Sequence, residues 1–251
     1  MDLRYITCSG ANEENYTAEL VSLGRLSDKV EIGIVTSQHT MRANSVRNKW
    51  FNQILRENIQ SEVNLAMHIG GDWCTDFCNG KIAPELKQWL AARKYATNRP
   101  AIPRWQLNIG NGMNLRNENE MAAIIADYPD NEFIFSFNDN PLVVSYISRL
   151  YDTGVPFSLL FDSSYGTGHS PVKWETPRFA GHAHGYAGGL SGENVAEQLT
   201  RISNVIPFSY NTWIDAEFKL KKPGTMQFDA KRAETYVRGA LNWLRGHGRQ
   251  M

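Results

Sequence analysis

Two short motifs about 150 residues apart carry side chains that can transfer protons. Residues 4–10 form an apolar run that ends on Cys8, and residues 159–168 form one that ends on Asp162; small residues follow in both. A cysteine acts as a base when a helix N-terminus or a cation favours its thiolate. An aspartic acid holds a proton near neutral pH when burial raises its pKa. If the fold brings the two strand ends together, the chain has a candidate base facing a candidate acid.

The elements that position these residues follow from hydrophobic periodicity. Short runs rich in β-branched and aromatic residues predict eight strands, at residues 4–8, 30–36, 63–69, 105–109, 132–137, 157–162, 183–187 and 212–216. Helical spacing predicts helices at residues 16–26, 46–58, 83–92, 117–128, 142–151, 193–202 and 229–245. Alternation of strand and helix implies right-handed βαβ units and a parallel sheet.

Eight such units in 251 residues favour an α/β fold, namely a single (β/α)8 TIM barrel. This barrel is expected to span residues 1–251 as one domain. The sixth crossover is expected to be degenerate, because residues 170–179 hold two prolines and are too few for a full helix. No Gly-x-Gly-x-x-Gly follows the first strand, which argues against a dinucleotide-binding fold.

Polar residues stand at nearly every predicted strand end, although the strands before them are apolar. In a barrel these positions form the mouth, where active sites are built. A ring of buried polar groups costs free energy unless it serves a ligand. The positions are Cys8, Ser37, His68, Asn108, Asn138, Asp139, Asp162, Gly188, Gly189, Asp215 and Glu217.

Several of these positions lie in motifs that resemble one family, the phosphoribosylanthranilate isomerases of tryptophan biosynthesis. The matching segments occur in the family's order along most of the chain. They are Ile6-Thr7-Cys8-Ser9-Gly10, Arg42-Ala43-Asn44-Ser45, Met67-His68-Ile69-Gly70, Leu160-Phe161-Asp162-Ser163-Ser164, Gly166-Thr167-Gly168 with Trp174, Gly188-Gly189-Leu190-Ser191-Gly192-Glu193-Asn194-Val195, and Ile214-Asp215. Residues 159–195 carry the most specific part of the resemblance.

The resemblance implies an Amadori rearrangement, in which an aminoaldose linked to a phosphosugar opens and becomes an aminoketose. Asp162 is then the general acid for ring opening and Cys8 the general base at the sugar C2. Arg42 is a candidate clamp for a substrate carboxylate. The expected substrate-binding residues are Arg42, His68, Asn108, Asn138, Gly166, Gly168, Gly188, Gly189, Asp215 and Glu217.

The phosphate site is expected at Gly188 and Gly189, because a helix start at residues 191–193 would turn backbone N–H groups toward an anion. The loop after the eighth strand departs from the family. The family has Asp-x-Ser-Ser-Gly-x-Glu there, and this chain has Asp215-Ala216-Glu217-Phe218-Lys219. Glu217 would repel a phosphate, and Phe218 lacks the close backbone approach of glycine.

Bulk composition excludes some partners and favours others. The 26 Lys and Arg balance 26 Asp and Glu, so neither a nucleic-acid nor a membrane partner is expected. Three cysteines are too few for a disulfide framework, and the N-terminus carries no signal pattern, so a cytoplasmic location is expected. The predicted ligand is an anionic or phosphorylated small molecule, bound without metal or cofactor by a monomer or homodimer.

The sequence leaves open whether the chain catalyses a reaction. One alternative is a non-catalytic barrel that binds or sequesters a nucleotide-like or ribose-containing molecule, suggested by the altered loop after the eighth strand and by aromatic residues near the mouth. Another is a barrel enzyme that uses Asp162, Asp215 and Glu217 as metal ligands or as acid and base.

Overall fold

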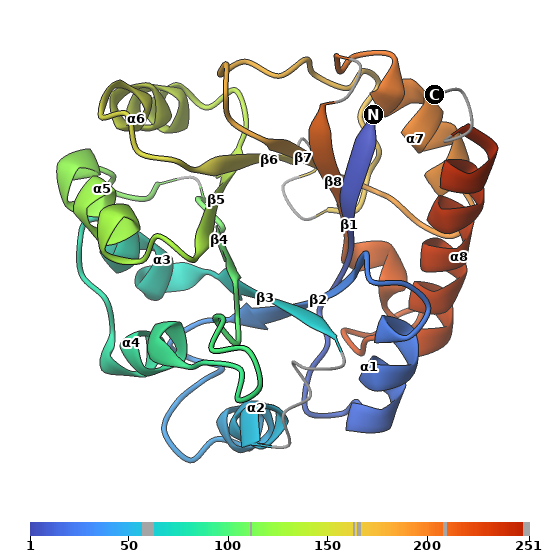
Figure 1. Ribbon diagram of the computed structural model, residues 1–251, viewed down its shortest axis with the longest axis horizontal. Helices are drawn as coiled ribbons and strands as arrows, with labels where there is room; N and C mark the ends of the chain where they lie inside the picture. The colour runs from blue at the N-terminus through green and yellow to red at the C-terminus, as the bar shows by residue number, and fades with distance from the viewer. Residues whose placement is uncertain (57–62, 111, 163, 165–166, 208–209, 248–251) are drawn as a thin grey trace.

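The chain folds into a closed barrel of eight parallel strands whose order around the barrel follows the sequence (Figure 1). This computed structural model describes residues 1–56, 63–110, 112–162, 164, 167–207 and 210–247. The strands are β1 (Asp2–Ser9), β2 (Val30–Thr36), β3 (Asn64–Ile69), β4 (Arg104–Leu107), β5 (Glu132–Phe137), β6 (Ser158–Asp162), β7 (His184–Ala187) and β8 (Asn211–Ala216). The predicted (β/α)8 barrel is confirmed.

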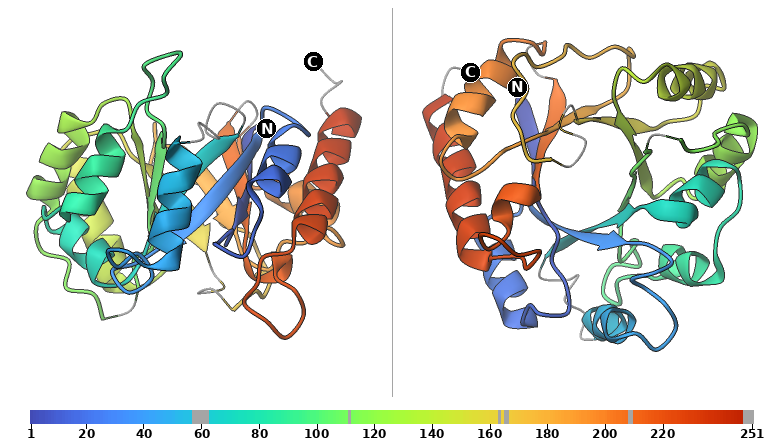
Figure 2. Two further views of the ribbon diagram at one scale, coloured as in Figure 1. Left: turned by 90° about the horizontal axis from the view of Figure 1, so that it is seen from below. Right: turned by 180° about the vertical axis from the view of Figure 1, so that it is seen from behind.

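Helices pack around the outside of the barrel (Figure 2). They are α1 (Thr17–Gly24), α2 (Val46–Arg56), α3 (Gly71–Cys78), α4 (Pro84–Ala91), α5 (Glu118–Asp127), α6 (Pro141–Asp152), α7 (Val195–Ser203), the 3-10 turn η2 (Phe218–Leu220) and α8 (Ala230–His247). The sequence did not predict α3. This short helix begins at Gly71, whose φ of 64° is left-handed, and it buries Cys74, Phe77 and Cys78. In the described part of the chain, no helix has the length and apolar character needed to cross a membrane.

The sixth crossover lacks a helix throughout its described residues, 164 and 167–183, as predicted. An extended segment covers the outer face of β7 and contacts the end of β5 instead. Trp174 packs edge-on against Tyr186 of β7, and its Nε1 donates a hydrogen bond to Gln198 Oε1 of α7 at 3.0 Å. The ring of Phe179 contacts Phe137 of β5. Aromatic anchors therefore replace helix packing at this place.

The alternation of residues along β1 decides which side chains enter the barrel. Thr7 Oγ1 donates to Glu31 Oε1 at 2.7 Å and Ser9 Oγ donates to Asp215 Oδ1 at 2.6 Å, so Thr7 and Ser9 point inward. Cys8, between them, belongs to the apolar core between strands and helices. Successive strand side chains point to opposite faces, so this pattern is the expected one.

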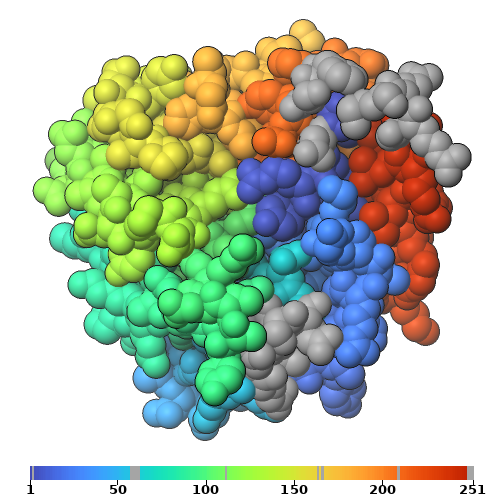
Figure 3. Space-filling view, viewed as in Figure 1, coloured from blue at the N-terminus to red at the C-terminus, as the bar shows by residue number. Residues whose placement is uncertain are grey.

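The end of the barrel at which the strands begin is closed by a buried ion-pair cluster. The Arg104 guanidinium bonds to Glu31 Oε1 at 2.6 Å and to Glu132 Oε2 at 3.0 Å. The rings of Tyr5 and Trp213 lie 4.4 and 4.6 Å from the same guanidinium carbon. Figure 3 views this end and shows it filled by packed side chains. The opposite end, where the strands finish, is the open one.

Candidate functional site

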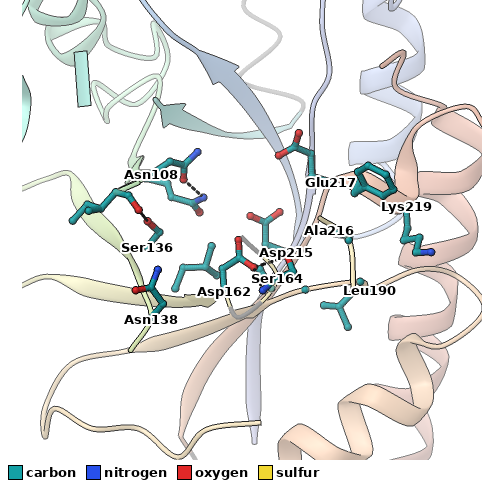
Figure 4. Close-up of a pocket in the computed structure, with 18 of the residues that line it drawn as sticks. Asn108, Ser136, Asn138, Asp162, Ser164, Leu190, Asp215, Ala216, Glu217 and Lys219 are labelled. Atoms are coloured by element: carbon teal, nitrogen blue, oxygen red, sulfur yellow. Dashed lines mark hydrogen bonds between the residues drawn. The ribbon is translucent and has the colours of Figure 1, made fainter. Parts of the chain in front are cut away.

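The mouth of the barrel holds a cavity of about 390 Å³ at the ends of β4 to β8 (Figure 4). Its walls are polar where the strands finish and apolar at Ile109, Leu160 and Leu190. Its volume falls in the range of small-molecule sites. The polar side chains that line it are Gln106, Asn108, Ser136, Asn138, Asp162, Ser164, Asp215, Glu217 and Lys219.

Asp215 lies at the floor of this cavity, 5% exposed, as the penultimate residue of β8. Burial is the main cause that raises the pKa of its carboxyl to about 8, and the nearby Glu217, Glu31 and Asp162 carboxylates raise it further. The hydrogen bond from Ser9 acts in the opposite direction. Asp215 therefore carries a proton at neutral pH and can give it to a ligand.

Asp162 enters the same cavity from the end of β6 (Figure 4). Its Oδ1 accepts hydrogen bonds from the backbone N–H of Ser164 at 2.9 Å and from Ser164 Oγ at 2.7 Å. These two bonds fix the carboxyl group and engage one oxygen, so Oδ2 is the oxygen offered to a ligand. The predicted place of Asp162 at the mouth matches the structure.

Glu217 also lines the cavity, and it forms an ion pair with the buried Lys221, with Nζ and Oε1 2.8 Å apart. Gly10 lies against this pair: a Cβ there would make ordinary contacts, 3.4 Å from Glu217 and 3.8 Å from Lys221, so the position favours glycine through its φ of 98°. The pair reduces the repulsion that Glu217 would exert on an anion. Lys219, two residues further, brings a positive charge to the cavity wall.

Gly188 and Gly189, the predicted phosphate site, line the cavity. The backbone at Ser170 occupies part of the space beside Gly189. A Cβ on Gly189 would lie 2.4 Å from the backbone nitrogen of Ser170. Helix α7 begins at Val195, later than the predicted start, and the Ser191 N–H donates to Asn194 Oδ1 at 2.9 Å. The backbone N–H of Ser191 is thus engaged within the loop.

Gly168 lines the cavity as well, and Phe218 explains the need for glycine there. A Cβ on Gly168, whose φ is 73°, would lie 2.4 Å from the Phe218 ring. The aromatic ring that departs from the family pattern thus packs on the glycine-rich loop after β6. Gly166 lies outside the described residues.

Cys8 does not face Asp162, which corrects the expected base and acid pair. Its side chain is fully buried in the core outside the barrel, and it does not line the cavity. Burial, and then the charges of Asp215 and Glu31, raise the pKa of the Cys8 thiol far above its ordinary value. A thiol in this setting has the properties of a small apolar side chain.

Two further candidates lie away from the cavity wall. Arg42 is exposed in the loop after β2, where its guanidinium lies 3.2 Å from His39 Nδ1. His68 is buried beneath the floor, with Nδ1 3.9 Å from Asp215 Oδ2 and 3.5 Å from Ser9 Oγ. Burial and the charge of Arg104 lower the pKa of His68 to about 3, so its ring is neutral.

Asn108 and Asn138 do line the cavity, and the structure adds neighbours that the sequence did not single out. Gln106 Nε2 donates to Asn108 Oδ1 at 2.8 Å, and Ser136 lies beside them on β5. Asn138 Oδ1 accepts from the Asn140 N–H at 2.9 Å. Gln106 and Ser136 stand two residues before Asn108 and Asn138, so the period of two would have identified them.

The described residues contain no group of three or more His, Cys, Asp or Glu side chains placed to hold a metal ion. Asp162, Asp215 and Glu217 thus share a cavity without forming such a group. The arrangement supplies instead one protonated carboxyl and one hydrogen-bonded carboxyl, which are the components of acid–base chemistry.

Comparisons with known proteins place the chain among barrels. No family model and no curated protein matches it. One similar solved structure is a monomeric form of the dimeric phosphoribosylanthranilate isomerase from Thermotoga maritima, with 14% identity, a TM-score of 0.53, and coverage of 95% of this chain and 99% of that one. Two more, at a TM-score of 0.49, are 3-hexulose-6-phosphate synthase from Salmonella typhimurium (9% identity; 95% of this chain, 99% of that one) and KGPDC from Streptococcus mutans (11%; 96% and 99%). The first likeness supports the TIM-barrel fold.

Proposed function

We propose that the chain is an aldose–ketose isomerase that performs an Amadori-type rearrangement on a sugar-linked amine in the mouth of the barrel. The observation that carries the proposal is the pair of carboxyl groups in one cavity, Asp215 buried with its proton and Asp162 held at Oδ1 by Ser164. The motif resemblance over residues 159–195 also supports it. Both roles now differ from those that the resemblance implied: Asp215 replaces Asp162 as the acid, and Asp162 replaces Cys8 as the base.

Asp215 is the general acid of this proposal. Its proton passes to the ring oxygen of the sugar as the bond between C1 and that oxygen breaks, and the nitrogen lone pair forms a C=N bond. Asp215 is left as a carboxylate, which Ser9 stabilises through its hydrogen bond. Because the pKa of Asp215 is about 8, the acid is present below that pH and is lost above it.

Asp162 is the general base. Its Oδ2 takes the proton from the sugar C2. The electrons of that C–H bond form the C1=C2 bond of an enolamine, and the electrons of the C=N double bond return to the nitrogen. The enol O–H then returns a proton to Asp215, and Asp162 returns its proton to C1, which completes the ketose. Both carboxyl groups end the cycle in the state in which they began it.

The remaining wall suits a hydroxylated ligand that carries one anionic group. Asn108 and Asn138 supply amide groups for hydroxyls. Lys219 is placed to meet a phosphate, and the ion pair with Lys221 offsets the charge of Glu217. The ring of Phe218 and the side chain of Leu190 give an apolar surface for the amine substituent.

The test is turnover of N-(5-phosphoribosyl)anthranilate, followed by chromatography of the ketose product. Asp162→Asn and Asp215→Asn should each lower kcat by about 10²-fold or more, the usual contribution of a general acid or base. Cys8→Ala should leave kcat within about threefold, because its side chain lies outside the barrel. Asp130→Asn, at an exposed turn, is the matched control.

Three results would overturn the proposal. Wild-type protein that retains the sugar-linked amine through gel filtration and yields no product would favour the non-catalytic binding barrel. Loss of turnover in folded Cys8→Ala would return the base to Cys8. Full turnover in Asp215→Asn would remove the acid proposed for ring opening.

A further inference from the structure

Three buried polar side chains from different strands meet beneath the cavity floor. Ser9 on β1 donates its hydroxyl proton to Asp215 Oδ1 on β8 at 2.6 Å. Ser9 Oγ also lies 3.5 Å from Nδ1 of His68 on β3. All three are at most 5% exposed, so no bulk water competes for these contacts. Of the three, only Asp215 lines the cavity.

The absence of a side chain on Gly33 makes this meeting possible. Strand β2 lies between β1 and β3, so Ser9 and His68 are not on neighbouring strands. A Cβ on Gly33 would lie 2.4 Å from Ser9 Oγ and 2.9 Å from the His68 ring. Ser9 and His68 therefore reach one another over Gly33, and any larger residue there would push them apart.

The number of available protons determines which atom donates in each of these hydrogen bonds. A serine hydroxyl has one hydrogen, and here that hydrogen goes to Asp215 Oδ1. The ring of His68 must then donate to Ser9 Oγ, which assigns the tautomer with hydrogen on Nδ1. An oxygen that accepts in a neutral carboxyl group is the carbonyl oxygen, so the acidic proton of Asp215 lies on Oδ2.

We propose that Ser9 and His68 are positioning residues that act through Asp215: the chain from His68 Nδ1–H through Ser9 Oγ–H to Asp215 Oδ1 keeps the acidic proton on Oδ2 and stabilises the carboxylate left after donation. Neither residue lines the cavity. The inference rests on the proposed function only in treating Asp215 as the acid. Its effect on the proton of Asp215 exists in the ligand-free protein.

Asp215 is surrounded by other titratable groups, and each could alter its titration. Those on the inner side of the barrel are mostly carboxylates, while a thiol and a phenol face it from the outer layer. They are Glu31, Asp162, Glu217, His68, Cys8 and Tyr236, with Arg104 beyond His68. The variants that test the chain leave all of these unchanged except His68 itself.

The direct test is a carboxyl carbon NMR titration of Asp215 in the ligand-free protein, assigned with Asp215→Asn. Ser9→Ala should raise the pKa of Asp215 by about one to two pH units, the effect of one hydrogen bond to a charged group. Ser9→Thr keeps the hydroxyl and should restore a value near that of the wild type. His68→Leu should shift the pKa in the same direction by less, and His68→Asn, which keeps a donor, should reverse that shift.

Gly33→Ala is the second variant, because it displaces the contact without replacing either partner. It should raise the pKa of Asp215 as Ser9→Ala does. Gly246→Ala, where a Cβ would meet nothing within 4 Å, is its matched control. If His68→Leu fails to fold, the pKa of Asp215 in Gly33→Ala and in His68→Asn still tests the contribution of His68.

Kinetics give the second readout. Ser9→Ala and Gly33→Ala should lower kcat by about tenfold with KM unchanged, and should move the alkaline limb of the pH profile with the titrated pKa. An unchanged titration in Ser9→Ala would overturn the inference even in an active enzyme, and so would a change in KM alone. A shifted titration in a protein without turnover would uphold it while the proposed isomerase activity fails.

Discussion

Burial gives Asp215 a role in stability as well as in the proposed chemistry. The pKa of its carboxyl is about 8 in the folded chain, and an unfolded aspartate has a pKa of about 3.9. Between these values the folded chain holds a proton that unfolding releases. The free energy of unfolding therefore falls as pH rises through this window. The site keeps its acid at the expense of the barrel's stability.

Asp215→Asn should remove this dependence. The slope that it removes is at most about 1.4 kcal/mol per pH unit between pH 4 and pH 8. The variant should accordingly be more stable than the wild type at pH 8, with a smaller difference at pH 5. Urea unfolding across that range measures the effect, with Asp130→Asn as the exposed control. Parallel slopes in wild type and Asp215→Asn would contradict the assignment.

At the scale of elements, the extended sixth crossover depends on a few aromatic anchors. Trp174 is 1% exposed, packs on Tyr186 and bonds to Gln198. Trp174→Ala should lower the free energy of unfolding by about 3–5 kcal/mol, as for other large buried aromatics. Val172→Ala, at a 95% exposed position two residues away, should change it by less than about 0.5 kcal/mol. Chemical denaturation measures both, and equal losses would show that the segment is not anchored there.

Most elements of the barrel could be predicted because their sequence periods are clear. The strand at Val30–Thr36 agrees with the predicted bounds at both ends. The two prolines in residues 170–179 correctly predicted that the sixth crossover has no full helix. Helix α3 was not predicted because it starts directly after β3 at Gly70 and Gly71, and a pair of glycines is typical of a loop.

The site was predictable at strand ends but not in its pairings. Cys8 was chosen as the last apolar residue of its strand, whereas the alternation of Thr7 and Ser9 with Cys8 places Ser9 inward. The contact between Ser9 and His68 depends on the register of three strands and on Gly33 between them. Such a contact belongs to the assembled barrel, and no single segment of sequence encodes it.

At the scale of the whole molecule, buried groups whose pKa values are shifted in opposite directions set the pH of greatest stability. Burial lowers the pKa of His68 to about 3 and that of His184 to about 4, from about 6.5 in an unfolded chain. Their contributions are complete above pH 6.5 and are lost as pH falls toward 3. Asp215 acts in the opposite sense from pH 4 to pH 8. Two histidines outweigh one aspartate below pH 6.5, so stability should be greatest near that pH.

Guanidinium midpoints measured from pH 4 to pH 9 at constant ionic strength check this maximum. Above pH 8 the buried thiol of Cys8, whose pKa is raised, extends the decline. A midpoint that continues to rise beyond pH 8 would contradict the expected balance.

The Arg104 cluster closes the far end of the barrel and therefore limits how a ligand can enter and leave. Within the described residues, the cavity opens on the side where the strands finish, and the other end is packed with ion pairs and aromatic rings. A ligand that enters by the mouth must leave by it. For the proposed isomerase, aldose and ketose would exclude one another from this single cavity, and accumulating ketose would inhibit by blocking the one opening.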